Sequence, residues 1–246
     1  MQKVLVNKMQ KKKTIAFIFA RGGSKGLPFK NKLILAGHPL IAYSIYISKI
    51  NSMIDDVYVS TDSEEISNIA FNYGAKVIER PKKLAEDNSP EYLSWKHAIK
   101  DVQSSIGLFD NFISLPPTSP LRSLEDTKKC LLAINNQADS IITITPSSRS
   151  PWFNMVEKDP DNYVTILNNS KNISRRQDTP ESFDITTVAY VSTPKFILNT
   201  SSIWDGRVKA IIIPKERAID IDDKFDFFVA NHFISQRKDL IIQKFY

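Results

Sequence analysis

A short loop near the start of the chain gathers the residues best suited to bind a phosphorylated ligand. It spans residues 20–31, reads ARGGSKGLPFKN and follows the apolar run TIAFIF at 14–19. Glycine lets a backbone approach a ligand closely and point N–H groups at it, and Arg and Lys supply charge and donors for phosphate oxygens. The loop holds Arg21, Gly22, Gly23, Ser24, Lys25, Gly26 and Lys30. It therefore predicts a cradle for the phosphates of a nucleotide.

Neither of the two common phosphate-loop patterns describes this loop. The pattern G-x-x-x-x-G-K-[ST] requires Lys and then Ser or Thr after its last glycine, where this chain has Leu27 and Pro28. The pattern G-x-G-x-x-G fails because the glycines stand at positions 22, 23 and 26. From the composition of the loop alone, a turn with a purely structural role stays open.

Two acidic residues near the end of the chain, Asp220 and Asp222, are candidate metal ligands. In an extended segment, residues i and i+2 point to the same face, so both carboxylates can reach one ion. Mg²⁺ prefers hard oxygen ligands, commonly one or two carboxylates together with phosphates and water. The alternative is a helix cap beside a solvated charge, since a helix is expected from about Asp223.

An alternation of strands and helices must position these residues. Strands are expected at 14–19, 56–61, 76–79, 111–115 and 139–145, and helices from about Pro39, Asp62, Glu91 and Ser123. Asp62 is expected to cap its helix, with Glu65 completing a capping box. This order with short connections is typical of an α/β fold, a mainly parallel sheet with helices on both faces. The loops after the strands should share one edge, where ligands of such sheets bind.

The pattern changes after residue 145. Residues 146–184 are rich in Pro, Asn, Ser and Asp and show little periodicity, so we expect an insertion that forms hairpins or an arm. Strands are expected again at 185–192 and 208–214, and a helix capped by Asp223 closes the domain. We therefore expect a basic tail over residues 1–13 and a single domain over residues 14–246.

Charge and composition favour a cytoplasmic enzyme over a membrane or nucleic-acid-binding protein. The net charge is +6, but five lysines at or before residue 13 supply most of it and leave +1 for the rest. The one cysteine excludes an intrachain disulfide. No apolar run approaches the roughly 18 residues of a membrane span, and the N-terminus lacks the apolar core of a signal peptide. Binding of nucleic acid through the basic tail is the minority alternative.

Several stretches of the sequence resemble the CMP-sialic acid synthetases, or acylneuraminate cytidylyltransferases. The similarity begins with the loop at 20–31 and continues in the same order to about the C-terminal helix. It includes GHPLIAYSI at 37–45, VYVSTDSEEI at 57–66, YGAKVIERP at 73–81, PTSPLR at 117–122, RRQDTPE at 175–181 and AIDIDDKFD at 218–226. The resemblance implies a Rossmann-like nucleotidyltransferase fold. It also implies a reaction that joins CTP to a nine-carbon 2-keto acid sugar, releases pyrophosphate and uses Mg²⁺.

The resemblance implies roles for residues on the nucleotide side. Arg21 and Lys25 match cations that hold the triphosphate, and together with Asp220 they form the expected catalytic set. The expected nucleotide contacts are Ala20, Arg21, Gly22, Gly23, Ser24, Lys25, Lys30, Asn31, Arg80 and Ser89. We therefore expect CTP to lie along the loop and to reach the segment around residues 80–89.

On the sugar side, the resemblance implies that the insertion and a strand after it bind the acidic acceptor sugar. Arg175 and Arg176 match a segment that contacts the sugar carboxylate, and Tyr190 matches a tyrosine near the sugar. The pair of Asp220 and Asp222 matches the family's metal site, which favours metal binding over a helix-capping role for this pair. The insertion matches a dimer interface, so a homodimer is expected.

Two departures from the family pattern fall on the sugar side. Pro116 stands where the family usually has Gln, and residues 186–190 read TTVAY where many members have NGAIY. Cytidylyl transfer should be unaffected, but the acceptor stays open among N-acylneuraminate, legionaminate, pseudaminate and an eight-carbon 3-deoxy-octulosonate type of sugar. The alternative from a different class is a non-catalytic nucleotide or nucleic-acid binder.

Overall fold

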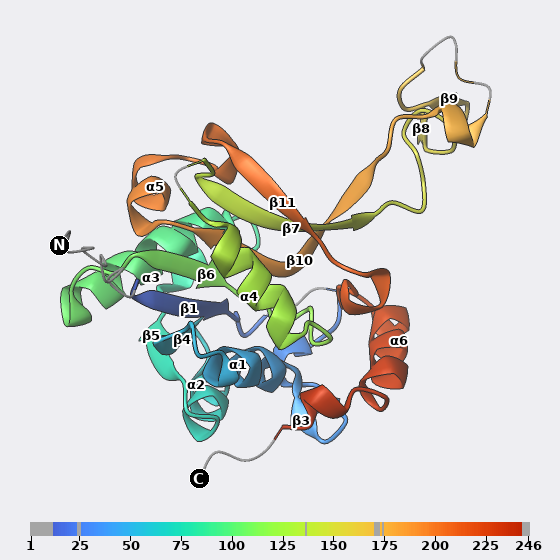
Figure 1. Cartoon of the computed structure of the whole chain (residues 1–246). Helices are drawn as coiled ribbons and strands as arrows, with labels where there is room; N and C mark the ends of the chain where they lie inside the picture. The colour runs from blue at the N-terminus through green and yellow to red at the C-terminus, as the bar shows by residue number, and fades with distance from the viewer. Residues whose placement is uncertain (1–11, 24–25, 136, 170–172, 174, 243–246) are drawn as a thin grey trace, which may run out of the picture.

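The computed structural model describes residues 12–23, 26–135, 137–169, 173 and 175–242. A seven-stranded sheet with the order β11-β7-β10-β6-β1-β4-β5 forms its centre (Figure 1). Its strands are β1 (Thr14–Phe19), β4 (Asp56–Thr61), β5 (Lys76–Glu79), β6 (Asn111–Ser114), β7 (Ser140–Pro146), β10 (Phe183–Ser192) and β11 (Val208–Ile212). Each of them overlaps a strand expected from the sequence.

The directions of the strands confirm a mainly parallel sheet. β1 is parallel to both β4 and β6, β4 is parallel to β5, and β11 is parallel to β7. β10 is the exception, because it is antiparallel to both β6 and β7. The insertion between β7 and β10 reverses the chain, so β10 returns alongside the strand it left. Its register on β7 shifts between Thr186 and Val191, which marks a bulge.

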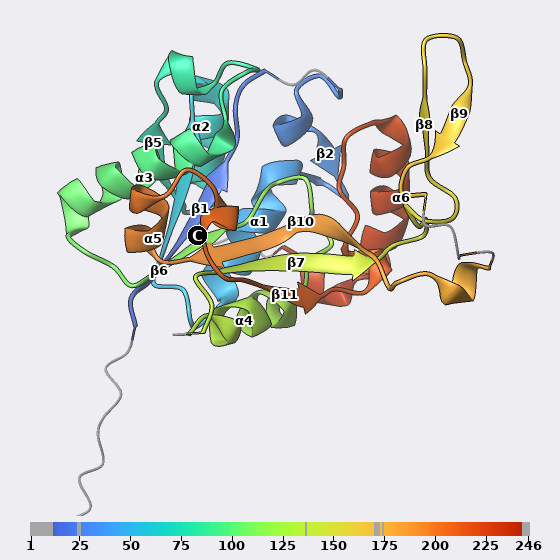
Figure 2. The same ribbon diagram turned by 90° about the horizontal axis from the view of Figure 1, so that it is seen from above.

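Helices cover both faces of the sheet, as expected (Figure 2). They are α1 (Leu40–Ile50), α2 (Glu64–Asn72), α3 (Glu91–Ile106), α4 (Leu124–Ala133), α5 (Pro194–Asn199) and α6 (Lys224–Ile234). Ala16 and Ile18 of β1 pack in one core with α1, α2 and α4. Ile15 and Phe17 pack in another core with α3 and α5. Successive residues of a strand point to opposite faces, so one strand serves both cores.

The helix caps agree with the expected ones at two helices and differ at one. Ser123 with Asp126 and Asp223 with Asp226 form capping boxes at the starts of α4 and α6. Asp62 does not cap α2, because Ser63 accepts the hydrogen bond from Ile66 N instead. The Asp62 carboxylate accepts a hydrogen bond from Gly22 N at 2.9 Å. The expected cap was therefore wrong by one residue, since a loop distant in the sequence supplies the partner of Asp62.

The stretch expected to be an insertion projects from the body as an arm (Figure 1). It carries a hairpin of β8 (Val156–Lys158) and β9 (Val164–Ile166) and the short 3₁₀ helix at Arg176–Asp178. β7 and β10 extend slightly into the range expected for it. The basic tail expected over 1–13 lies almost entirely outside the described residues. No helix that the structure describes is both long and apolar enough to traverse a bilayer.

Candidate functional site

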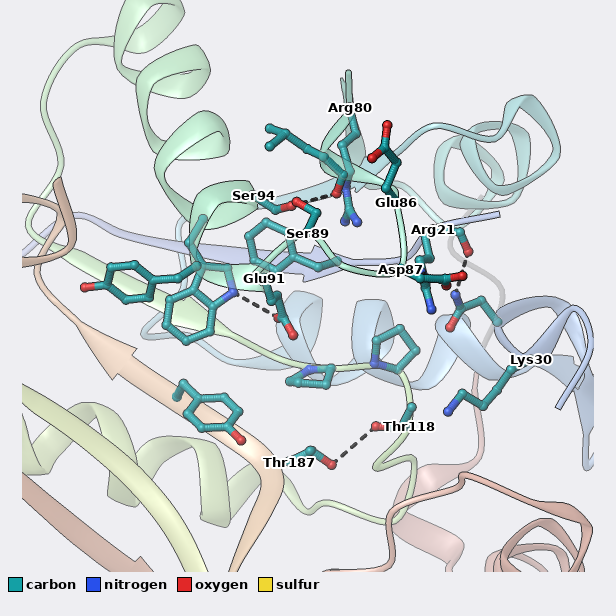
Figure 3. A pocket seen from close by; sticks show the side chains of 18 of the residues that line it. Arg21, Lys30, Arg80, Glu86, Asp87, Ser89, Glu91, Ser94, Thr118 and Thr187 are labelled. Atoms are coloured by element: carbon teal, nitrogen blue, oxygen red, sulfur yellow. Dashed lines mark hydrogen bonds and ion pairs between the residues drawn. The ribbon is translucent and has the colours of Figure 1, made fainter. Parts of the chain in front are cut away.

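A cavity of about 840 Å³ opens at the carboxyl ends of β1, β5 and β6 (Figure 3). Arg21 follows β1, Arg80 follows β5, and Pro116 to Thr118 follow β6, and all of them line it. The N-terminus of α3, β10 and the segment before α6 complete the wall. The loops therefore share one edge of the sheet, as the alternation of strands and helices predicted.

The cavity brings together many of the site residues expected from the sequence. Its lining includes Arg21, Lys30, Asn31, Arg80, Ser89, Tyr190, Asp220 and Asp222. Ala20, Gly22 and Gly23 belong to the same loop but do not line the cavity, and Ser24 and Lys25 lie outside the described residues. Arg175 and Arg176 are exposed on the arm and do not line the cavity of their own chain.

Contacts with distant segments hold the glycine-rich loop against the body. Asn31 Nδ2 donates to Arg21 O at 3.1 Å, so the two ends of the loop are tied together. Leu27 is buried in a core formed largely by α1 and α6. A Cβ atom on Gly26 would lie 2.6 Å from Asp222 O, so only glycine allows this approach. The loop and the Asp220–Asp222 segment are therefore in direct contact.

Carboxylates in the cavity balance the loop cations. Arg21 Nη1 lies 2.6 Å from Asp87 Oδ1, and Lys30 Nζ lies 2.9 Å from Asp222 Oδ1. Both pairs are partly open to solvent, so each contributes little to the free energy of folding. The cavity wall thus offers both cationic groups and carboxylates, as binding of a phosphate–metal complex requires.

Arg80 has a structural role as well as a place in the cavity wall. Its guanidinium donates to Ser60 Oγ at 3.2 Å and to Ser60 O at 2.7 Å, and it lies over the ring of Phe19. Burial lowers the pKa of the Arg80 guanidinium, whereas the negative charges of Glu91 and Asp62 act to raise it. The side chain is thus fixed in place before any ligand arrives.

Asp220 has the surroundings expected of a cation ligand. Its Oδ1 is buried and accepts no hydrogen bond from any residue that the structure describes. Burial raises the pKa of its carboxyl, as does the charge of Asp222, whereas hydrogen bonds from Thr118 and Thr187 lower it. A buried carboxylate oxygen without a partner is costly unless a ligand binds it. Asp220 and Asp222 therefore fit a hard cation such as Mg²⁺.

The rest of a metal shell would have to come from ligand or water. Within the described ranges, no three His, Cys, Asp or Glu side chains lie close enough together to hold an ion. Mg²⁺ commonly binds through one or two carboxylates and substrate phosphates, so a pair is sufficient.

One residue that shapes the cavity was not predicted from the sequence. Arg122 lies in the quoted PTSPLR stretch, but we assigned it no role. It is fully buried and donates to the carbonyl oxygens of Pro116, Thr187 and Val188. Burial lowers its pKa to about 9. Arg122 thereby joins the end of β6 to the bulge of β10. The only feature of the sequence that could have indicated this role was an arginine within the PTSPLR stretch to which no function had been assigned.

Comparisons with known proteins agree with this geometry. The family model described as Cytidylyltransferase matches residues 15–199. A post-translational flagellin modification protein B of Campylobacter coli is 32% identical over 223 residues, covering 89% of this chain and 94% of that protein. A CMP-N,N'-diacetyllegionaminic acid synthase of Campylobacter jejuni is 31% identical, covering 89% and 93%.

Two further comparisons concern a longer relative and the fold. An N-acylneuraminate cytidylyltransferase of Escherichia coli is 30% identical over 89% of this chain, which spans only 51% of that protein. The solved structure of a CMP:2-keto-3-deoxy-manno-octonic acid synthetase complexed with CTP superposes with a TM-score of 0.70. It covers 92% of this chain and all of that one at 15% identity, so it supports the fold alone.

Proposed function

The chain belongs to the cytidylyltransferase family, and on that premise we propose that it transfers CMP from CTP to a sialic-acid-like 2-keto acid sugar and releases pyrophosphate. The acceptor would be an N-acylneuraminate or a related nonulosonate. The observation that carries this proposal is a single cavity that brings a cationic loop together with Asp220, whose buried Oδ1 has no hydrogen-bond partner among the described residues.

The nucleotide would occupy the part of the cavity between the loop and the segment at 80–89. Arg21 and Lys30 would exchange their carboxylate partners for oxygens of the triphosphate, since charge-assisted bonds to phosphate are strong. Lys25, outside the described residues, would add a further cation. Arg80 and Ser89, which line the same side, would contact the nucleoside.

Asp220 and Asp222 would hold Mg²⁺. When bound, the ion would supply Lewis acidity and charge neutralisation at the phosphates. The fixed backbone contact between Gly26 and Asp222 would keep the two carboxylates in register with the loop. Thr118 and Thr187 would orient Asp220 through their hydroxyl groups.

The reaction would be a displacement at the α-phosphorus. The anomeric hydroxyl oxygen of the sugar forms the new bond to phosphorus, and the bond to the β-phosphate oxygen breaks. Pyrophosphate leaves with its added charge balanced by Arg21 and Lys30, and the hydroxyl proton is released. The residues of the cavity would contribute by holding the two substrates in line.

The acceptor would bind on the side of the cavity lined by Pro116, Thr187 and Tyr190. Relatives are named for legionaminic acid, N-acylneuraminate and pseudaminic acid, which supports a nine-carbon acidic sugar. An eight-carbon acceptor is the alternative, since one structural neighbour is a synthetase named for 2-keto-3-deoxy-manno-octonic acid. Arg175 and Arg176 would reach the sugar carboxylate only from the arm of a second copy in a homodimer.

CTP is a cytoplasmic metabolite, so we propose that the enzyme acts in the cytoplasm.

Pyrophosphate release with CTP, Mg²⁺ and a panel of 2-keto acid sugars tests the proposal, with ATP, GTP and UTP as nucleotide controls. Release that requires both CTP and one nine-carbon sugar is the expected result. Release with only an eight-carbon acceptor would show that the substrate is an eight-carbon sugar and not a nonulosonate. Absence of release from folded protein that also fails to bind CTP would overturn the proposal. Salt-sensitive binding of RNA or DNA lost on deletion of residues 1–12 would favour the nucleic-acid binder.

A further inference from the structure

Glu91 is an acidic residue of the cavity for which the proposed reaction provides no role. It is the first residue of α3, and its side chain extends into the cavity (Figure 3). Trp95, one helical turn later, donates from Nε1 to Glu91 Oε1 at 2.9 Å. An acidic residue in the first turn also interacts favourably with the helix dipole. The carboxylate therefore has a defined position at the cavity wall.

An aromatic cluster makes that position rigid. Trp95 is buried, and its ring centroid lies 5.1 Å from that of Phe112 and 5.7 Å from that of Tyr190. It also lies 5.5 Å from Tyr92 and 6.3 Å from Phe19. The indole cannot follow a moving carboxylate without disturbing this packing. Glu91 is thus pre-organised, which is a property of groups that recognise a ligand.

The second carboxylate oxygen remains available to the cavity. Among the residues that the structure describes, only Trp95 donates to Glu91, and it does so to Oε1. Glu91 is open to the solvent of the cavity but has protein on most other sides. This desolvation raises its pKa, while the hydrogen bond from Trp95 and the charge of Arg80 act in the opposite direction. Oε2 is therefore an acceptor that a ligand can satisfy.

Through Trp95, Glu91 adjoins the acceptor side of the cavity, and its charge also interacts with Arg80, which is proposed to contact the nucleoside. Its hydrogen-bond partner Trp95 packs on Tyr190, whose pKa is raised to about 12 by burial and by the charges of Glu91 and Asp220. Arg21 and Lys30, the cations proposed above to bind phosphate oxygens, pair with other carboxylates. A carboxylate beside the triphosphate would repel it, whereas one beside a sugar can accept from N–H and O–H groups.

From this geometry, and resting on the proposed function, we infer that Glu91 determines acceptor specificity by accepting a hydrogen bond from an acylamino N–H or hydroxyl group of the sugar. Trp95 acts as a positioning residue that directs Oε2 towards the ligand. A rigid acceptor in a partly desolvated site discriminates against sugars that lack the donor, because the carboxylate then loses a hydrogen bond to the ligand. The interaction therefore selects among sugars that share the same 2-keto acid end.

The test compares Glu91→Gln with the wild type on a nine-carbon acceptor and on analogues that each lack one donor group. Glutamine keeps the size of the side chain and a carbonyl oxygen for Trp95, but it presents an NH₂ group in place of Oε2. We expect kcat/KM for the full acceptor to fall by about 10- to 100-fold, with KM for CTP within about twofold. One analogue should lose activity in the wild type but show no further loss in the variant.

Glu64→Gln is the matched control. Glu64 is also the first residue of a helix, α2, but it is exposed and does not line the cavity. It reports any effect of removing a charge from a helix N-terminus, and acceptor specificity should be unchanged. Thermal unfolding of both variants checks that the folded state persists.

The outcomes separate this inference from the proposed function. If the wild type releases pyrophosphate but Glu91→Gln affects all analogues equally, only the specificity role falls. A rise in KM for CTP without an effect on the acceptor would instead assign Glu91 to the cytosine amino group. If the wild type neither turns over nor binds any acceptor by calorimetry, the proposed function and this inference fall together.

Discussion

The Asp220 carboxylate has one buried oxygen with no hydrogen-bond donor among the described residues. Its pKa is raised mainly by burial, so the folded state holds the ionised form at some energetic cost. Residues kept for stability are seldom arranged in this way, whereas functional groups often are. The neighbouring Asp222 differs, because it is exposed and paired with Lys30.

Replacing Asp220 with Asn should separate activity from stability. We expect turnover to fall at least about 100-fold, since a group that stabilises developing charge is removed. The free energy of unfolding should stay unchanged or rise, because a partly buried unsatisfied charge is lost. Steady-state kinetics and urea denaturation measure the two effects.

A clear loss of folding stability in Asp220→Asn would assign the residue a structural role. Activity close to that of the wild type would exclude it as a metal ligand. Titration with Mg²⁺ adds an independent readout, since the stabilisation of wild-type protein by the ion in the presence of CTP should be weaker in the variant.

At the scale of elements, α4 fixes the segment that carries Asp220 and Asp222, the proposed metal ligands. Asp126, in the first turn of α4, is buried and accepts from Arg217 Nε at 2.9 Å and from Arg217 Nη2 at 3.0 Å. The same carboxylate completes the capping box with Ser123. Arg217 precedes Asp220 by only three positions. One ion pair therefore joins a helix start to the wall of the cavity.

Asp126→Asn should destabilise the protein by about 2 kcal/mol at pH 7, because it breaks a largely buried pair and weakens a cap. Burial acts to raise the pKa of Asp126, but the hydrogen bonds from Arg217 and Ser123 outweigh it, so the pKa is lowered on folding. The unfolded carboxyl therefore binds a proton first as the pH falls below about 4. The stabilisation is present above that pH and is lost progressively below it.

Denaturant unfolding of wild type and Asp126→Asn across roughly pH 3–7 tests this. The difference in unfolding free energy should be constant above about pH 5 and should shrink below about pH 4. A difference that does not depend on pH would show that the ion pair is not its source. Glu125→Gln, at an exposed position of the same helix turn, is the control.

At the scale of the whole molecule, the arm is the feature that one chain does not explain. Its hairpin exposes Val156, Tyr163, Val164 and Leu167, and Tyr163 retains 75% of its accessible surface. The arm also carries Arg175 and Arg176, which lie outside the cavity lining of their own chain. Apolar exposure of this kind is characteristic of an association surface. It supports the proposed homodimer.

Sedimentation should give twice the mass of the chain for the wild type and the mass of one chain for Tyr163→Asp. The variant should fold, because the side chain is exposed in the single chain. Phe71→Asp, at an equally exposed apolar residue of α2, should leave the mass unchanged. If the arm completes the acceptor site of the second copy, the monomer should bind CTP but lose most acceptor turnover. A wild-type protein that sediments as one chain would contradict the homodimer.

The local features of the fold could be predicted from the sequence. The strand before the glycine-rich loop and the helix caps at Ser123 and Asp223 agree with the structure. Asp220 and Asp222, expected to share one site, both line the cavity. Each depends on residue types a few positions apart, through strand patterning, capping or the alternation of an extended segment. The family resemblance added the residues expected to contact the nucleotide, several of which line the cavity.

The remaining features depended on partners that are distant in the sequence. Asp62 accepts a hydrogen bond from Gly22 and does not cap its helix, and Arg122 joins the end of β6 to the bulge of β10. Trp95, which holds Glu91 from the next turn of α3, packs against the distant Tyr190. The antiparallel course of β10 follows from the path of the arm. Which residue caps a helix, which charge is buried and which side chains line a cavity all depend on the groups that come into contact when the chain folds. The sequence by itself therefore determined the elements and the loop that could hold a nucleotide, and the tertiary structure decided which side chains line the cavity.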